Sequence, residues 1–116
     1  EILKEIKILN GISFLSKEIK MDSNDIKTTC FEIGKSFKNL VLILASRVND
    51  KAIVACYVSR ELTESHGLSA EEIIKSISKF IDGGGGGQSF FATAGGKNPD
   101  GISNALNSAK SIIDNL

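Results

Sequence analysis

Two long apolar runs mark the middle of the chain. Residues 40–46 and 52–58 are almost continuously apolar, and Asn49-Asp50 separates them. Asn and Asp tolerate the positive φ angles of a tight hairpin turn, so the pattern predicts two adjacent antiparallel strands. Because polar residues do not alternate with apolar ones, both faces of these strands should be covered. We therefore expect the pair to be central in a sheet, with Leu42 and Ile53 in the core.

Three other segments carry apolar residues at helical spacing. Their apolar positions are Ile26, Cys30, Ile33 and Phe37; Ile73, Ile74, Ile77, Phe80 and Ile81; and Ile102, Ala105, Leu106, Ala109, Ile112 and Ile113. Asp22 or Ser23 can cap the first helix, and Ser69 with Glu72 forms a capping box at the second. Asn98 is expected to cap the third. The pattern predicts three amphipathic helices, of which the second ends at Asp82.

The remaining segments have weaker patterns. Residues 12–19 and 90–94 are expected to form strands, and residues 60–67 a polar loop. Residues 1–9 have helical spacing, which is typical of the end of an upstream helix. On pattern alone, that helix either pairs with another chain or packs on its own domain.

These elements together predict an α+β fold. We expect a small sheet of three to four strands with a central antiparallel hairpin, three helices packed on one side of it, and an N-terminal helix stub. Residues 1–10 are interpreted as the end of an upstream linker or coiled-coil helix, and residues 11–116 as the C-terminal domain.

Five consecutive glycines, residues 83–87, follow the second helix. Each loses about 0.5–1 kcal/mol more conformational entropy on folding than alanine would. One interpretation is a disordered linker, but such linkers carry Ser, Pro or charge and join separable units. This run lies within one compact pattern, which favours a loop whose N–H groups approach a phosphate or a base edge.

The residues after the glycines add candidate contacts. The order helix, glycines, strand differs from that of the Walker A and dinucleotide-binding motifs. In a strand Phe90 and Phe91 point to opposite faces, so one can be buried while the other stacks on a base, although both could be buried. Lys97 can contact a phosphate, or can simply be a solvated lysine. The candidate nucleic-acid-binding residues are Gly83, Gly84, Gly85, Gly86, Gly87, Gln88, Phe90, Phe91, Thr93, Gly95, Gly96, Lys97 and Asn98.

Composition limits the function classes. The 116 residues suit one domain, and the formal net charge of zero argues against a general polyanion binder. Cys30 and Cys56 lie in apolar patterns and are expected in the core, while His66 lies in a polar segment without other metal ligands. We find no nucleophile–base arrangement and no long apolar segment, so we expect a non-catalytic, cytoplasmic domain without a metal or membrane span.

The stretch from Asp82 to Pro99 resembles the C-terminal domain of bacterial alanyl-tRNA synthetases, which is related to the DHH-associated domains of DHH phosphoesterases. The similarity extends from Gly11 to the C-terminus. In the synthetases the glycines are commonly followed by Arg-Pro-Asp-Met-Ala-Gln-Ala-Gly-Gly. Here Gln88 replaces the cation and Phe90 the acid, which favours a stacking contact over a charged one.

The resemblance implies a non-catalytic module that binds the outer corner of tRNA and couples aminoacylation to editing. Its partners would be tRNA of alanine identity, the upstream catalytic and editing domains of the same chain, and in some cases a second copy. ATP, Mg²⁺ and zinc would belong to the parent enzyme, with no cofactor in this fragment. The alternatives are the substrate-binding terminal domain of a DHH-type phosphodiesterase and a non-catalytic dimerisation module. The longer glycine run and the Ala-Gly-Gly-Lys-Asn-Pro ending favour the synthetase.

Overall fold

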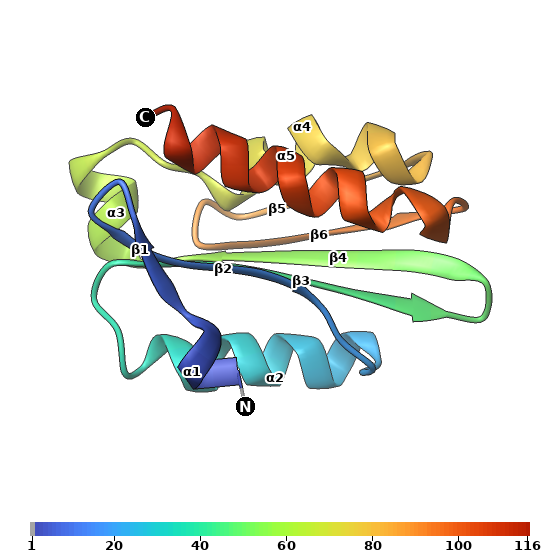
Figure 1. Cartoon of the computed structure of the whole chain (residues 1–116), viewed down its shortest axis with the longest axis horizontal. Helices are drawn as coiled ribbons and strands as arrows, with labels where there is room; N and C mark the ends of the chain where they lie inside the picture. The colour runs from blue at the N-terminus through green and yellow to red at the C-terminus, as the bar shows by residue number, and fades with distance from the viewer. Residues whose placement is uncertain (1) are drawn as a thin grey trace.

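A six-stranded sheet runs through the centre of the molecule between two layers of helices (Figure 1). The computed structural model describes residues 2–116. The strands are β1 (Lys7–Leu9), β2 (Ile12–Glu18), β3 (Leu40–Val48), β4 (Lys51–Val58), β5 (Gly83–Gly87) and β6 (Phe91–Gly96). Their order across the sheet is β1-β2-β3-β4-β6-β5. The β2–β3 pair is parallel, and the other neighbouring pairs are antiparallel.

Helices cover both faces of this sheet. The α-helices are α1 (Ile2–Glu5), α2 (Ser23–Gly34), α3 (Arg60–Ser65), α4 (Ala70–Ile77) and α5 (Ile102–Asp114), and the 3₁₀ helices are η1 (Ser78–Ile81) and η2 (Pro99–Gly101). The α2 helix connects the parallel strands and packs on one face, whereas α4 and α5 lie on the other (Figure 1). The predicted α+β class and its three amphipathic helices are confirmed. Within residues 2–116, no helix has both the length and the apolar character needed to span a bilayer.

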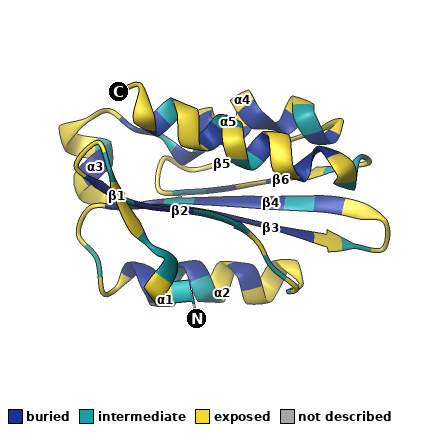
Figure 2. Ribbon diagram, viewed as in Figure 1, coloured by how far each residue is buried: buried dark blue, intermediate teal, exposed yellow. Residues whose placement is uncertain are grey.

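The central hairpin is β3–β4, as predicted. Its turn residues Asn49 and Asp50 have φ angles of 53° and 62°, the left-handed conformation that these side chains tolerate. Residues 40–46 of β3 are all buried, and Figure 2 shows the buried residues concentrated on the central strands. Continuous apolar sequence therefore marks the strands that are covered on both faces.

The apolar side chains of β3 divide between two cores. Leu40, Leu42 and Leu44 pack in the cluster that includes α2, and Val41, Ile43 and Ala45 in the cluster that includes α4 and α5. The expectation that the helices pack on one side only is therefore wrong. A strand that is apolar on both faces needs a cover on each face, and a single helical layer supplies only one.

The sheet has six strands, whereas three to four were predicted. The two strands that were not predicted, β1 and β5, are the edge strands of the sheet. At one edge, the expected N-terminal helix includes only Ile2–Glu5, and Lys7–Leu9 forms β1. Asn10 and Gly11 have φ angles of 56° and 79°, so they turn the chain into a hairpin that pairs Leu9 with Ile12. Left-handed residues at such a pair are typical both of helix ends and of hairpin turns, and here they form a hairpin.

The expected loop at residues 60–67 contains the short helix α3. Leu62, on this helix, is 1% exposed and belongs to the core on the α4 and α5 side. One buried leucine in an otherwise polar segment gives no helical periodicity, which explains why the pattern predicted a loop.

Candidate nucleic-acid interface

The glycine run forms an ordered edge strand and not the loop that was predicted. β5 pairs with β6 from Gly83 opposite Gly96 to Gly87 opposite Ala92. A Cβ atom built on Gly83 would collide with the backbone oxygen of Gly95, and one built on Gly85 with that of Thr93. Glycine is therefore required at these positions because the two backbones approach too closely for any side chain.

The hydrogen bonds at both ends of this hairpin fix the direction of its backbone groups. The Gln88 N–H donates to the Phe91 oxygen at 2.8 Å, and the Lys97 N–H donates to the Asp82 oxygen at 3.5 Å. In an antiparallel ladder, hydrogen-bonded pairs alternate with pairs that are not bonded to each other. The N–H and C=O groups of Gly83, Gly85 and Gly87 consequently point away from β6, along the outer edge of the sheet.

Phe90 and Phe91 differ in burial, which settles which of them is accessible. Phe90, in the β5–β6 turn, is 40% exposed, whereas Phe91 packs against the core on the α2 side. The ring of Phe31 on α2 lies 6.3 Å from that of Phe90 and 5.2 Å from that of Phe91, measured between centroids. Phe90 therefore has a supporting ring behind it while part of its surface faces solvent.

The same aromatic cluster includes a tyrosine and a lysine. The rings of Phe31 and Tyr57 are 5.4 Å apart in an edge-to-face arrangement, and Lys27 Nζ is 5.9 Å from the centre of the Phe91 ring. Burial raises the pKa of Tyr57 above its ordinary value, so the phenol is neutral at physiological pH. The cluster is thus an apolar platform with one cation at its side.

The predicted helix start is observed in part, because Asn98 stands at the N-cap position of η2 and Pro99 is the first residue of that helix. The Asn98 side chain does not cap a helix; its Nδ2 donates to the Phe80 oxygen at 3.4 Å and its backbone N–H to the Ile81 oxygen at 2.9 Å. Pro99 begins the short 3₁₀ helix η2, and α5 starts at Ile102. Asn98 therefore ties the end of β6 to η1, and the donor-rich end of a long helix lies further along the chain than expected.

All the predicted site residues lie on the β5–β6 hairpin or at its ends. Gln88 and Phe90 lie at the turn, whereas Gly96, Lys97 and Asn98 lie at the opposite end. A strand rises about 3.3 Å per residue, so these two groups are separated by roughly 15 Å. A single small ligand cannot contact both, but an extended strand of nucleic acid can.

Comparison with known proteins agrees with this architecture. The model of the DHHA1 domain family matches residues 11–115. The chain belongs to the DHHA1 domain family. The relationship to the DHH-associated domains, indicated by the stretch from Asp82 to Pro99, is thereby confirmed.

Relatives of this DHHA1 domain include alanine–tRNA ligases. The chain is 45% identical over 109 residues to that of Christiangramia forsetii, covering 94% of this chain and 12% of the relative. It is 38% identical over 112 residues to that of Flavobacterium psychrophilum, covering 97% of this chain and 13% of the relative. The chain therefore spans only 12–13% of the length of these curated relatives.

A solved structure has the same fold along nearly its whole length. The C-Ala domain from Aquifex aeolicus alanyl-tRNA synthetase matches this DHHA1 domain with a TM-score of 0.85 and 25% sequence identity. The match covers 94% of this chain and 97% of that chain. The resemblance to the C-terminal domain of alanyl-tRNA synthetases is confirmed by this match and by the relatives.

Several residues beside the hairpin were not predicted from the sequence. Glu71 on α4 accepts a hydrogen bond from the Gly87 N–H at 3.5 Å and lies 3.8 Å from the ammonium group of Lys75. Phe31 on α2 lies at the centre of the aromatic cluster, and Lys27 on the same helix lies beside it. The four-residue spacing of Lys27 and Phe31 could have placed them on one helix face. No comparable signal links Glu71 to a strand that follows later in the chain.

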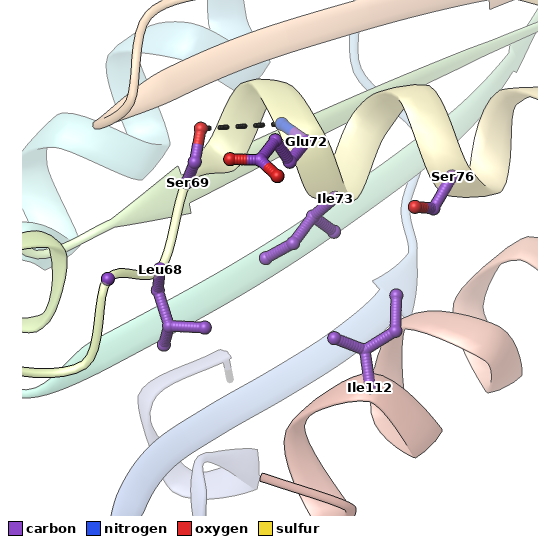
Figure 3. A pocket seen from close by; sticks show the side chains of 7 residues that line it. Leu68, Ser69, Glu72, Ile73, Ser76 and Ile112 are labelled. Atoms are coloured by element: carbon purple, nitrogen blue, oxygen red, sulfur yellow. Dashed lines mark hydrogen bonds between the residues drawn. The ribbon is translucent and has the colours of Figure 1, made fainter.

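A cavity of about 240 Å³ lies between the start of α4 and the end of α5, away from the hairpin (Figure 3). It is lined by Gly67, Leu68, Ser69, Glu72, Ile73, Ser76 and Ile112, none of which is a predicted site residue. The Ser69 hydroxyl accepts a hydrogen bond from the Glu72 N–H at 3.4 Å, drawn as a dashed line in Figure 3, which confirms the Ser69 half of the predicted capping box. This cavity therefore belongs to the packing of α4 against α5.

Cys30 and Cys56 are both buried, as predicted. Burial raises the pKa of the Cys30 thiol to about 12 and raises that of the Cys56 thiol as well. Both thiols are therefore protonated at physiological pH. Across residues 2–116, His, Cys, Asp and Glu side chains form no group of three or more that could hold a metal ion.

Proposed function

We propose that this DHHA1 domain is the tRNA-binding C-terminal domain of an alanine–tRNA ligase. It would bind the outer corner of tRNA of alanine identity and couple aminoacylation to editing in the cytoplasm. The similarity to alanine–tRNA ligases and to a C-Ala domain supports this assignment. The parent enzyme would supply the chemistry, using ATP and Mg²⁺ in its catalytic domain and zinc in its editing domain. This domain would contribute binding without catalysis.

We propose the β5–β6 hairpin as the surface that binds tRNA. Gly83, Gly84, Gly85 and Gly87 are exposed and carry no side chains of their own, so a nucleic-acid strand can approach their backbone closely. At the turn, Phe90 offers an aromatic face supported by Phe31. Stacking of one base on such a ring contributes about 1–3 kcal/mol to binding.

Substitution of Phe90 tests this surface. Because Phe90 is 40% exposed and Phe91 is packed into a core, Phe90→Ala should remove a contact with the least effect on folding. We expect Phe90→Ala to weaken binding of tRNA of alanine identity by about 1–3 kcal/mol, measured by fluorescence anisotropy. Its thermal unfolding should remain close to that of the wild type.

A matched control is available at the opposite edge of the sheet. Ile8 on β1 is 71% exposed, so Ile8→Ala also removes a large exposed apolar side chain. Ile8→Ala should bind tRNA like the wild type. If folded Phe90→Ala also binds like the wild type, the turn of the hairpin is not the tRNA surface.

A further inference from the structure

The outer edge of β5 presents hydrogen-bond donors and acceptors together. At Gly83, Gly85 and Gly87 an N–H and a C=O both point outward, since the alternate residues bond to β6. No further strand pairs with this edge within residues 2–116. A phosphate oxygen accepts hydrogen bonds but donates none, so the outward carbonyls oppose it. A ribose 2′-hydroxyl both donates and accepts, and matches this edge.

A carboxylate lies at the same edge. Glu71 Oε2 is 3.5 Å from the Gly87 nitrogen and would be 3.4 Å from a Cβ atom built on Gly86. The Glu71 side chain is 40% exposed, so a ligand on β5 can reach it. An ionised carboxylate repels phosphate and accepts hydrogen bonds from hydroxyl groups. Lys75, four residues further along the same helix and 3.8 Å away, offsets part of this charge, but it is Glu71 that accepts a hydrogen bond from the β5 backbone.

The geometry points to ribose recognition: the outer edge of β5, together with Glu71, contacts the 2′-hydroxyl groups of an RNA strand whose phosphates face away from it. This inference rests on the proposed tRNA-binding function and deepens it. The domain thereby distinguishes RNA from DNA at this edge, because only RNA carries the hydroxyl. Glu71 is the specificity-determining side chain, and glycine at positions 83–87 keeps the backbone accessible to the ribose.

The edge suits RNA better than a second copy of this chain. Pairing two β5 strands would bury no apolar side chains, because the strand contains only glycine. In an antiparallel pair centred on Gly85, Glu71 of each copy would also approach the Asp82 end of the other strand. Like charges placed together across such a ladder are destabilising.

The experiment compares two tRNAs of alanine identity that differ only in the sugars of the outer corner. One is all-ribose, and the other carries 2′-deoxyribose at the corner nucleotides. Wild-type protein should bind the deoxy-corner tRNA about three- to tenfold more weakly, the effect of losing one or two net hydrogen bonds. Glu71→Gln should bind the all-ribose tRNA more weakly and lose most of this discrimination.

Glu72→Gln is the matched control, because it removes the same charge from the same turn of α4. Glu72 faces the cavity of Figure 3 and not the hairpin, so this variant should discriminate like the wild type. Equal binding of both tRNAs by the wild type would overturn ribose recognition while leaving tRNA binding intact. Tighter binding of both tRNAs by Glu71→Gln would mean that phosphates occupy the edge, and would also overturn it. If the wild type binds neither tRNA, the proposed function fails together with this inference, whereas dimerisation through β5 in analytical ultracentrifugation would overturn this inference alone.

Discussion

At the scale of single residues, two apolar side chains of the same core differ in burial. Leu42 and Ile53 lie in the two central strands and both pack in the cluster on the α2 side. Leu42 is 0% exposed, while Ile53 is only half-buried. A large side chain that is fully enclosed leaves a cavity when it is shortened, whereas a half-buried one leaves a gap that water can reach.

Leu42→Ala and Ile53→Ala should therefore have unequal effects on stability. We expect Leu42→Ala to lower the free energy of unfolding by about 2–5 kcal/mol, and Ile53→Ala to lower it by less. Urea unfolding followed by circular dichroism measures both, provided that the denaturant dependence of the two variants matches that of the wild type. An equal loss for the two variants would contradict the packing described for α2.

The sequence predicted that Phe90 and Phe91 point to opposite faces of a strand, and left open whether one or both of them are buried. The alternation of a strand places neighbouring side chains on opposite faces. That arrangement is not observed here, because Phe90 lies in the turn before β6 and both rings lie near Phe31 on α2, at 6.3 Å and 5.2 Å. That information lies in tertiary packing, so local pattern could not supply it.

At the scale of elements, the strands with apolar side chains were predictable and the glycine strand was not. Patterns of hydrophobicity identify a strand through its side chains, and β5 has none. Glycine is also disfavoured in strands, so its propensity predicted a loop. Pairing with β6 overrides that propensity, because glycine allows the close approach seen at Gly83 and Gly85.

Alanine substitutions at neighbouring glycines test whether glycine is needed for the close approach of the β5 and β6 backbones or only for its conformational flexibility. A Cβ atom on Gly85 would collide with the backbone oxygen of Thr93, so Gly85→Ala should cost about 1–3 kcal/mol of stability or more. A Cβ atom on Gly84 meets no atom within 4 Å. Gly84→Ala should therefore be neutral, or stabilise by about 0.4–1 kcal/mol through the unfolded state.

Thermal and urea unfolding of the two single variants measure this difference. Both substitutions add the same methyl group to the same strand, so each serves as the control for the other. Similar stability of the two variants would show that β5 is not held against β6 in the way described.

At the scale of the whole molecule, positive and negative charges balance. Among residues 2–116, ion pairs join Arg47 to Glu18 and to Asp100, and Lys17 to Glu5. The formal net charge is zero, so the domain has no overall attraction for a polyanion. Binding of tRNA would then depend on stacking and backbone contacts at one hairpin, with few phosphate contacts.

The salt dependence of tRNA binding tests this distribution of contacts. Each phosphate that a lysine neutralises steepens the plot of log K against log salt by about one unit, and typical basic binders make about 6–10 such contacts. We expect a much shallower slope for this domain, reduced by about one further unit in Lys97→Ala. Lys7→Ala, which removes the same charge from β1 at the opposite edge, should leave the slope unchanged. A steep slope that responds to Lys7→Ala and not to Lys97→Ala would place the tRNA on the β1 edge, because counterion release follows the lysines that contact phosphate.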